Sequence, residues 1–187
     1  MSTIAGRAVQ YRFTFGSSSY DFAARTHIVG ILNVTPDSFS DGGRHFGAEQ
    51  AIRHALRMAE EGADFIDIGG ESSRPGSEQV PIEEELRRVI PVIELLAKEL
   101  RIPLSIDTSK SRVAQAALEA GATIVNDISG FTADPGMQAV VARHRATAVL
   151  MHMKGTPKTM QQNPVYEDVT TEVVGFLGGR VDRAHTA

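Results

Sequence analysis

Short apolar runs alternate with longer segments of helical periodicity through most of this chain, and no other feature limits its possible folds as strongly. The apolar runs occupy residues 27–32, 64–68, 103–106, 123–125 and 147–151. The helical patterns occupy residues 48–61, 82–100, 111–120, 135–145 and 168–182. Strands that are apolar throughout and separated by helices predict a parallel sheet covered by helices. The α/β class follows, as either an open doubly wound sheet or a (β/α) barrel.

The residues at the helix ends agree with these boundaries. Gly62 and Gly121 each follow a helical pattern, where a glycine commonly takes the left-handed conformation. Asp134 is expected to be the N-cap of a helix in which Pro135 takes the first position. The acidic run Glu83–Glu85 is expected in the first turn of a helix, where the helix dipole favours negative charge.

The amino-terminal residues follow a different pattern. Val9, Tyr11, Phe13 and Phe15 alternate with polar residues, and the turn-forming stretch 16–19 comes next. Apolar residues at every second position on either side of a Gly/Ser turn predict a β-hairpin.

The composition is that of an ordinary globular protein and excludes several classes. The chain has 187 residues, is 42% hydrophobic and carries a formal net charge of −4, so a basic nucleic-acid footprint is absent. It has no cysteine, which excludes disulfides and thiolate metal sites. No apolar run approaches the roughly 18 residues that cross a membrane, and the first residues lack the apolar core of a signal peptide. We therefore expect a cytoplasmic protein that binds neither nucleic acid nor membranes.

Polar residues follow four of the five predicted strands, where ligands bind in both candidate folds. They are Asn33, Asp67, Asp107 and Asn126. Such residues often cap the next helix, but the helices after Asn33 and Asp67 begin many residues later, and Asp134 is expected to cap the helix after Asn126. We therefore expect these side chains to face a shared cavity, although Asp67 could instead orient the neighbouring loops.

The first two strands are followed by long segments, 34–43 and 69–77, whereas such connections usually have about 2–6 residues. The second segment combines hydroxyls, glycines and Arg74, a set suited to a diphosphate. Alternatively, Arg74 is a solvated surface residue, and Phe39 packs beneath its own loop. The histidines lack the spacing of a zinc site, whereas Mg²⁺ needs only one or two protein oxygens beside a diphosphate.

Five stretches in this order resemble the signatures of the dihydropteroate synthase family. They are residues 30–43, 67–76, 105–110, 126–128 and 151–157. The resemblance implies a TIM (β/α)₈ barrel, of which this sequence would form about the first five βα units. Residues 1–26 would be a β-hairpin closing the bottom of the barrel, and residues 27–187 a partial, pterin-binding barrel.

The same resemblance implies the chemistry of folate biosynthesis. The family condenses a dihydropterin methyl diphosphate with p-aminobenzoate and releases pyrophosphate, with Mg²⁺ as cofactor, and its full-length members are expected to be homodimers. The implied roles are Asn33 for Mg²⁺, Ser73 and Arg74 for the diphosphate, Asp107 and Asn126 for the pterin ring, Ile128 and Met151 for its face, and Phe39 and Pro75 for the p-aminobenzoate ring. Asp107 is the implied catalytic residue, because a buried carboxylate stabilises a methylene cation developing beside the pterin.

The family pattern continues beyond the point that corresponds to Ala187. It includes three further strands with an Asp-Pro-Gly, a Ser-Arg-Lys and an Arg-Val-His motif, so we interpret the sequence as part of a longer enzyme. One alternative is a non-catalytic partial barrel. Another is a pterin-binding domain of the methyltransferase type, which the two candidate diphosphate segments disfavour because that chemistry has no diphosphate to hold.

Overall fold

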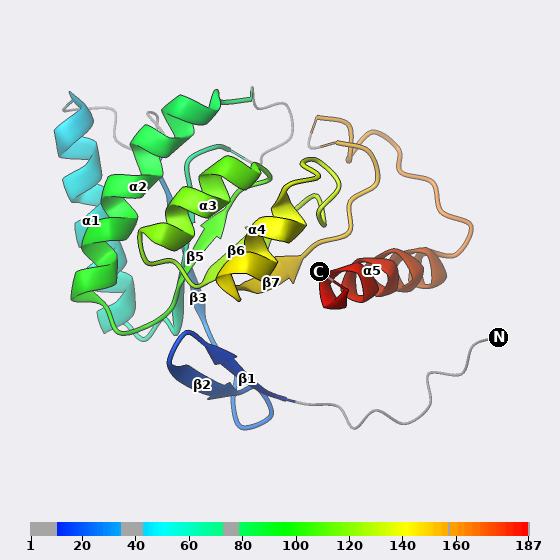
Figure 1. The fold of residues 1–187 in the computed structure, drawn as a ribbon, viewed down its shortest axis with the longest axis horizontal. Coiled ribbons are helices and arrows are strands. Elements are labelled where there is room, and N and C mark those ends of the chain that lie inside the picture. The colour runs from blue at the N-terminus through cyan, green and yellow to red at the C-terminus, as the bar shows by residue number, and fades with distance from the viewer. Residues whose placement is uncertain (1–10, 35–42, 73–78, 157, 187) are drawn as a thin grey trace.

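The protein contains a five-stranded parallel sheet whose strand order is the order of the chain. The computed structural model describes residues 11–34, 43–72, 79–156 and 158–186. The strands run β3-β4-β5-β6-β7 across the sheet (Figure 1). Their bounds are β3 Val29–Asn33, β4 Phe65–Gly69, β5 Leu104–Asp107, β6 Ile124–Asp127 and β7 Thr147–Leu150. The predicted α/β class with parallel strands is confirmed.

A helix connects each strand to the next, and a further helix follows β7. The helices are α1 Gly43–Glu60, α2 Ile82–Glu99, α3 Ser111–Glu119, α4 Met137–His144 and α5 Val169–His185. Helices α1 to α4 lie side by side on one face of the sheet, and α5 lies beyond β7 (Figure 1). This is the arrangement of consecutive right-handed βα units, the repeating element of a (β/α) barrel.

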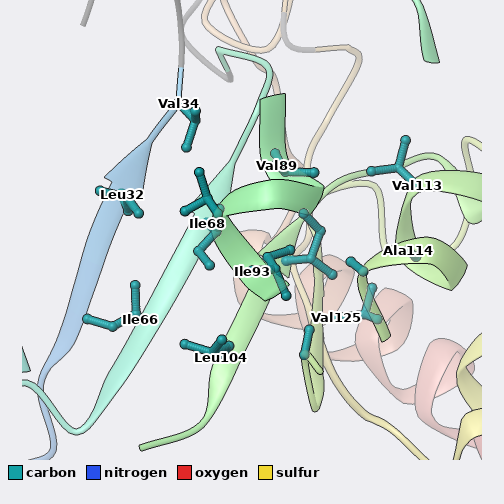
Figure 2. Close-up of a cluster of buried hydrophobic side chains, with 14 of the residues drawn as sticks. Leu32, Val34, Ile66, Ile68, Val89, Ile93, Leu104, Val113, Ala114 and Val125 are labelled. Atoms are coloured by element: carbon teal, nitrogen blue, oxygen red, sulfur yellow. The ribbon is translucent and has the colours of Figure 1, made fainter. Parts of the chain in front are cut away.

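Side chains alternate between the two faces of the sheet along each strand, and the core lies on the face covered by the helices. Leu32, Ile68 and Ile106 are at most 1% exposed and pack against Val89 and other apolar residues of the helices. Figure 2 shows strand side chains meeting those of α2 and α3 in this layer. Because neighbouring residues of a strand point to opposite faces, the residues between these core positions lie on the face turned away from α1 to α4.

Two glycines end helices in a conformation that other residues rarely adopt. Gly62 follows α1 with a φ of 105°, and Gly121 follows α3 with a φ of 119°. A Cβ added at Gly121 would lie 2.6 Å from the Cβ of Ala97, whereas nothing lies within 4 Å of one at Gly62. The prediction of left-handed glycines at these two ends is confirmed.

The predicted cap of α4 is wrong. The helix begins at Met137, and its N-cap position is Gly136, which makes no side-chain capping bond. The Asp134 carboxylate instead accepts hydrogen bonds from the backbone N–H of Ser111 at 2.8 Å and of Gly136 at 2.8 Å. Asp134 therefore joins the start of α3 to the turn before α4, a tertiary role that local sequence does not reveal.

The predicted hairpin is present as strands β1 Arg12–Phe15 and β2 Ser18–Asp21. Phe15 and Tyr20 pack against Phe65 and Ile124, which are the first residues of β4 and β6. The hairpin thus contacts the amino-terminal ends of the parallel strands and lies below them in Figure 1. The division of the chain into domains at residue 26 stays a prediction.

Helix α5 has its own cap and is held to the loop before it. Asp168, expected inside the helix, is its N-cap and accepts hydrogen bonds from the backbone N–H groups of Thr170 and Thr171. Lys154 forms an ion pair of 2.7 Å with Glu172. None of the helices in the described residues is long and apolar enough to cross a membrane.

Candidate functional site

The carboxyl ends of the strands bring three predicted site residues into one row. Asn33 pairs with Gly69 across the sheet, Gly69 with Asp107, and Asp107 with Asn126. Residues paired in this way point to the same face, here the face away from α1 to α4. Asn33, Asp107 and Asn126 therefore lie side by side on this face, and Gly69 leaves the row without a side chain between Asn33 and Asp107.

Asp67 lies on the same face, one layer below this row. It pairs with Ser105 in β5, and its Oδ2 accepts a hydrogen bond of 3.0 Å from Nδ2 of Asn126. Its Oδ1 is buried and has no hydrogen-bond partner among the described residues. Because leaving a buried acceptor unpaired is costly, this oxygen is suited to a donor on a bound ligand. The sequence left the place of Asp67 open between site and loops, and the structure puts it beside Asn126.

Asp107 is surrounded by other acidic groups. Burial is the main cause that raises the pKa of its carboxyl group to about 7, and neighbouring negative charges raise it further. These charges belong to Asp67, Glu85, Asp127 and Glu71, in decreasing order of effect. A carboxyl group with this pKa is present in both protonation states near neutral pH, and a developing positive charge beside it favours the ionised state.

A buried aspartate organises the turn that holds Ile128. The Asp127 carboxylate is fully buried and accepts hydrogen bonds from the backbone N–H groups of Ser129 at 2.8 Å and Phe131 at 3.0 Å. Its backbone oxygen accepts a bond of 3.5 Å from the N–H of Met151. Ile128, which is half-buried, and Met151, which is 37% exposed, therefore both lie at the carboxyl ends of β6 and β7.

Sequence reasoning missed a polar cluster beside Asp107, which we call the Lys110 cluster. The ammonium group of Lys110 donates to carboxylate oxygens of Glu71 and Glu85 and to the backbone oxygen of Val80. Oγ1 of Thr108 donates to Glu85 at 2.7 Å. Burial alone would lower the pKa of the Lys110 ammonium, but its bonds to Glu71 and Glu85 outweigh burial, and the pKa is raised.

Glu85 lies in the acidic first turn of α2, as expected, but its burial was not predicted. The side chain of Glu85 is only 1% exposed, whereas acidic residues in a first turn are commonly solvated. A signal was available, because Glu85 lies four residues before Val89 and so falls on the buried stripe of the helix. An acidic residue on an apolar stripe needs a partner, which here is the Lys110 cluster.

Four predicted site residues fall outside the described residues. They are Phe39 in the first long segment and Ser73, Arg74 and Pro75 in the second. Residues 69–72 of the second segment and residues 79 and 80 after it are described, and Glu71 and Val80 both bond to Lys110. The roles of the four residues stay predictions.

The chemistry of the donors is compatible with Mg²⁺. The described residues contain no group of three or more His, Asp or Glu side chains that could hold a metal ion alone. Asn33 presents an exposed amide at the end of β3, and Mg²⁺ commonly takes one or two protein oxygens and completes its shell with phosphate oxygens and water. A single amide ligand beside a bound diphosphate fits this pattern.

Comparison with known proteins identifies the family of this chain. The family described as pterin binding enzyme matches residues 29–187. A dihydropteroate synthase from Synechocystis is 50% identical over 169 residues, which cover 90% of this chain and 58% of that protein. The Yersinia pestis dihydropteroate synthase, solved with a sulfonamide drug, is 44% identical with a TM-score of 0.85 over 94% of this chain and 63% of that one. The Xanthomonas albilineans enzyme, solved with 4-aminobenzoic acid, is 48% identical with a TM-score of 0.84 over 95% of this chain and 62% of that one.

This chain belongs to the pterin-binding enzyme family, because the family matches most of the chain. The parallel βα fold, with acidic and amide side chains at its strand ends, is consistent with that class. Within this family it is similar to the dihydropteroate synthases of folate biosynthesis. The predicted relation to the TIM-barrel synthases is confirmed. The chain spans about three fifths of the length of these relatives, 58% of the Synechocystis protein and 63% of the Yersinia structure.

Proposed function

We propose that this chain carries the pterin-binding part of a dihydropteroate synthase site. The reaction joins a dihydropterin methyl diphosphate to p-aminobenzoate, and pyrophosphate leaves as the aniline nitrogen takes its place. The observation that carries the proposal is the row of Asn33, Asp107 and Asn126 at the strand ends, with Asp67 bonded to Asn126. This combination would offer acceptors to a hydrogen-bonding heterocycle and, at Asn33, an oxygen ligand to a metal ion.

Asp107 would be the residue that acts on the reacting carbon. Loss of pyrophosphate leaves positive charge on the methylene group and the pterin ring, and a carboxylate held next to that charge stabilises it. Because a nearby positive charge lowers the pKa of Asp107 from its raised value, the ionised form would predominate as the charge develops. The attacking aniline is already neutral, so a strong general base is not required.

Asn126 and Asp67 would hold the pterin ring in place. The bond from Nδ2 of Asn126 to Asp67 fixes the direction of the amide, so that its oxygen remains for a donor on the ring. The unpaired Oδ1 of Asp67 offers a second acceptor. Ile128 and Met151 would cover the face of the ring.

Asn33 would bind Mg²⁺, and Ser73 and Arg74 would bind the diphosphate. When bound, Mg²⁺ supplies positive charge that neutralises the leaving diphosphate. Phe39 and Pro75 would enclose p-aminobenzoate. Solved relatives from Xanthomonas contain 4-aminobenzoic acid in one structure and 7,8-dihydropteroate in another, which supports both ligand classes here. A homodimer of the whole enzyme and a cytoplasmic location belong to the same proposal.

The test is direct detection of dihydropteroate by mass spectrometry. The purified chain is incubated with both substrates and Mg²⁺, alongside an Asp107→Asn variant and a chain extended by three family-like βα units. Product from the chain that the variant loses supports the proposal for this chain. Product from the extended chain alone assigns the activity to a longer enzyme and makes this chain a non-catalytic part of it. No product from either contradicts the proposal.

A further inference from the structure

Two apolar residues lie at the carboxyl ends of β6 and β7, next to the acceptors of the site. Asn126 of β6 pairs with Val149 of β7, and Ile128 and Met151 are the first residues after these strands. Alternation continued by two residues turns both side chains to the face of Asn126. Ile128 is half-buried and Met151 is 37% exposed. We call this pair the apolar wall, because apolar groups beside a few polar acceptors are typical of sites for planar ligands.

Asp127 accepts hydrogen bonds from four backbone N–H groups around the apolar wall. Its carboxylate is fully buried and accepts from Ser129 at 2.8 Å and from Phe131 at 3.0 Å. Its backbone oxygen accepts from Gly130 at 3.0 Å and from Met151 at 3.5 Å. Three of these groups belong to the turn after β6 and one to the end of β7, so one residue holds both parts of the wall.

The turn after β6 has a conformation that needs such support. Gly130 and Phe131 both lie in the left-handed region, with φ values of 59° and 64°. Glycine adopts this region readily, whereas a residue with a large side chain does so only where its surroundings hold it there. The bond from the N–H of Phe131 to Asp127 supplies that support. Asp127 therefore fixes a turn that the residue type at position 131 does not favour by itself.

Gly130 allows this turn to close against its neighbours. A Cβ added at Gly130 would lie 3.0 Å from the backbone oxygen of Met151 and 3.0 Å from the ring of Phe176 on α5. The Phe176 ring also meets His152 edge to face, with 5.1 Å between the ring centroids. Helix α5 thus packs against both the turn after β6 and the end of β7, and little space is left between them.

We propose that Asp127 is a positioning residue that holds Ile128 and Met151 together as one wall against the face of the pterin ring. The inference rests on the proposed function for the identity of the ring. It does not depend on that function for the placement of the two side chains, which follows from hydrogen bonds within the chain. The role is indirect, because the carboxylate of Asp127 is fully buried and accepts from backbone groups.

The first experiment measures the nuclear Overhauser effect between the methyl groups of Ile128 and Met151, which needs no ligand. Residues that face the same way on neighbouring strands are about 5 Å apart, so the wild type should show a clear effect. In Asp127→Asn one acceptor oxygen replaces two, and the N–H of Ser129 or Phe131 loses its bond. The effect should then fall about threefold or more, because the turn opens and the methyl groups separate.

A second variant and a control complete this experiment. Gly130→Ala presses a Cβ against the backbone oxygen of Met151, so it should also weaken the effect. It leaves every charge in place, whereas Asp127→Asn also removes a negative charge that raises the pKa of Asp107. It also provides the test if Asp127→Asn does not fold. Asp134→Asn is the matched control, since Asp134 accepts two backbone N–H groups between the start of α3 and the turn before α4, and the effect should be unchanged there.

The second experiment adds 6-hydroxymethylpterin to the same variants. Calorimetry should show about tenfold weaker binding to Asp127→Asn and Gly130→Ala, because the ring loses contacts with a displaced wall. Asp134→Asn should keep its affinity within about threefold, even where its urea midpoint falls as far as theirs. In the wild type the ring proton of the pterin should show Overhauser effects to the methyl groups of both Ile128 and Met151. Each of the two wall variants should weaken one of these effects relative to the other.

Each outcome decides a separate statement. An unchanged effect between the two methyl groups in the folded wall variants would overturn the positioning role. An affinity loss in Asp134→Asn equal to theirs would overturn it too, since binding would then follow stability alone. A wild-type chain that does not bind 6-hydroxymethylpterin contradicts the pterin part of the proposed function. In that case a weakened effect between Ile128 and Met151 still supports the role of Asp127 in holding the wall.

Discussion

Replacing Asp107 by asparagine should make the folded chain more resistant to alkaline conditions. The carboxyl group has a pKa of about 7 in the folded protein, against 3.8 as its ordinary value. A group that holds its proton more tightly in the folded state costs stability when it ionises. Wild-type stability should therefore fall as the pH rises from about 4 to above 7. The amide of the Asp107→Asn variant cannot ionise, so the variant should escape this loss.

The size of the effect follows from the two pKa values. A difference of one pKa unit corresponds to about 1.4 kcal/mol. The difference between 3.8 and about 7 therefore sets an upper limit of ~4 kcal/mol on the stability lost above pH 7. Between pH 5 and pH 8 the same relation gives a loss of ~2–3 kcal/mol for the wild type. Relative to that of the wild type, the free energy of unfolding of the variant should rise by this amount between pH 5 and pH 8.

Urea unfolding at pH 5, 6, 7 and 8 measures this difference through the transition midpoints. Glu94→Gln on α2 is the control, because it removes an exposed carboxylate from the same fold. Dihydropteroate formation in any active form of the enzyme should meanwhile fall by about 100-fold or more in Asp107→Asn, since a charge aimed at the transition state is lost. Parallel losses of stability and activity, or a stability difference that does not change with pH, would refute the reasoning.

Three further perturbations test other parts of the molecule. Asn33→Ala should raise the Mg²⁺ concentration needed for half-maximal activity about tenfold, and an unchanged requirement would remove Asn33 from the metal site. Asp64→Asn should destabilise the chain at pH 6 and about half as much at pH 3, because bonds from Arg25 lower the pKa of Asp64 to about 2 and its contribution is lost as the pH falls toward that value; a constant difference in urea midpoint would contradict this. Gly62→Ala should lower the free energy of unfolding by about 1–3 kcal/mol because of the positive φ of Gly62. Gly121→Ala should lower it by about 1–3 kcal/mol more, because the added Cβ would contact Ala97. Equal melting temperatures of the two variants would show that this contact is relieved.

The strands, helices and hairpin were predictable from sequence because their patterns are local. Periods of two and of 3.6 residues identify the buried faces, and left-handed glycines mark the ends of α1 and α3. The row of polar side chains at the strand ends was predictable for a related reason. A polar residue that interrupts a buried strand at its carboxyl end, such as Asp107 or Asn126, already lies where parallel folds bind ligands.

The parts that could not be predicted are contacts between distant positions. Asn126 bonds Asp67 from 59 residues away, and Lys110 bonds Glu85 from 25 residues away. Asp134 looks like a helix cap in its own segment, but in the structure it accepts hydrogen bonds both from Gly136 in the turn before α4 and from Ser111 at the start of α3. In each case the side chain has a plausible local use, and only the packing of the sheet selects the tertiary one.

The identity between strand order and chain order has a consequence for biosynthesis. Each strand of the sheet pairs with the strand made just before it, so most pairings need only one connecting helix to emerge from the ribosome. The sheet can thus be assembled during translation by successive addition, without waiting for distant sequence. The hairpin is the exception, since Phe15 is synthesised early but its partners Phe65 and Ile124 arrive much later. Ribosome-bound nascent chains should therefore expose the aromatic residues of the hairpin until β6 has been made.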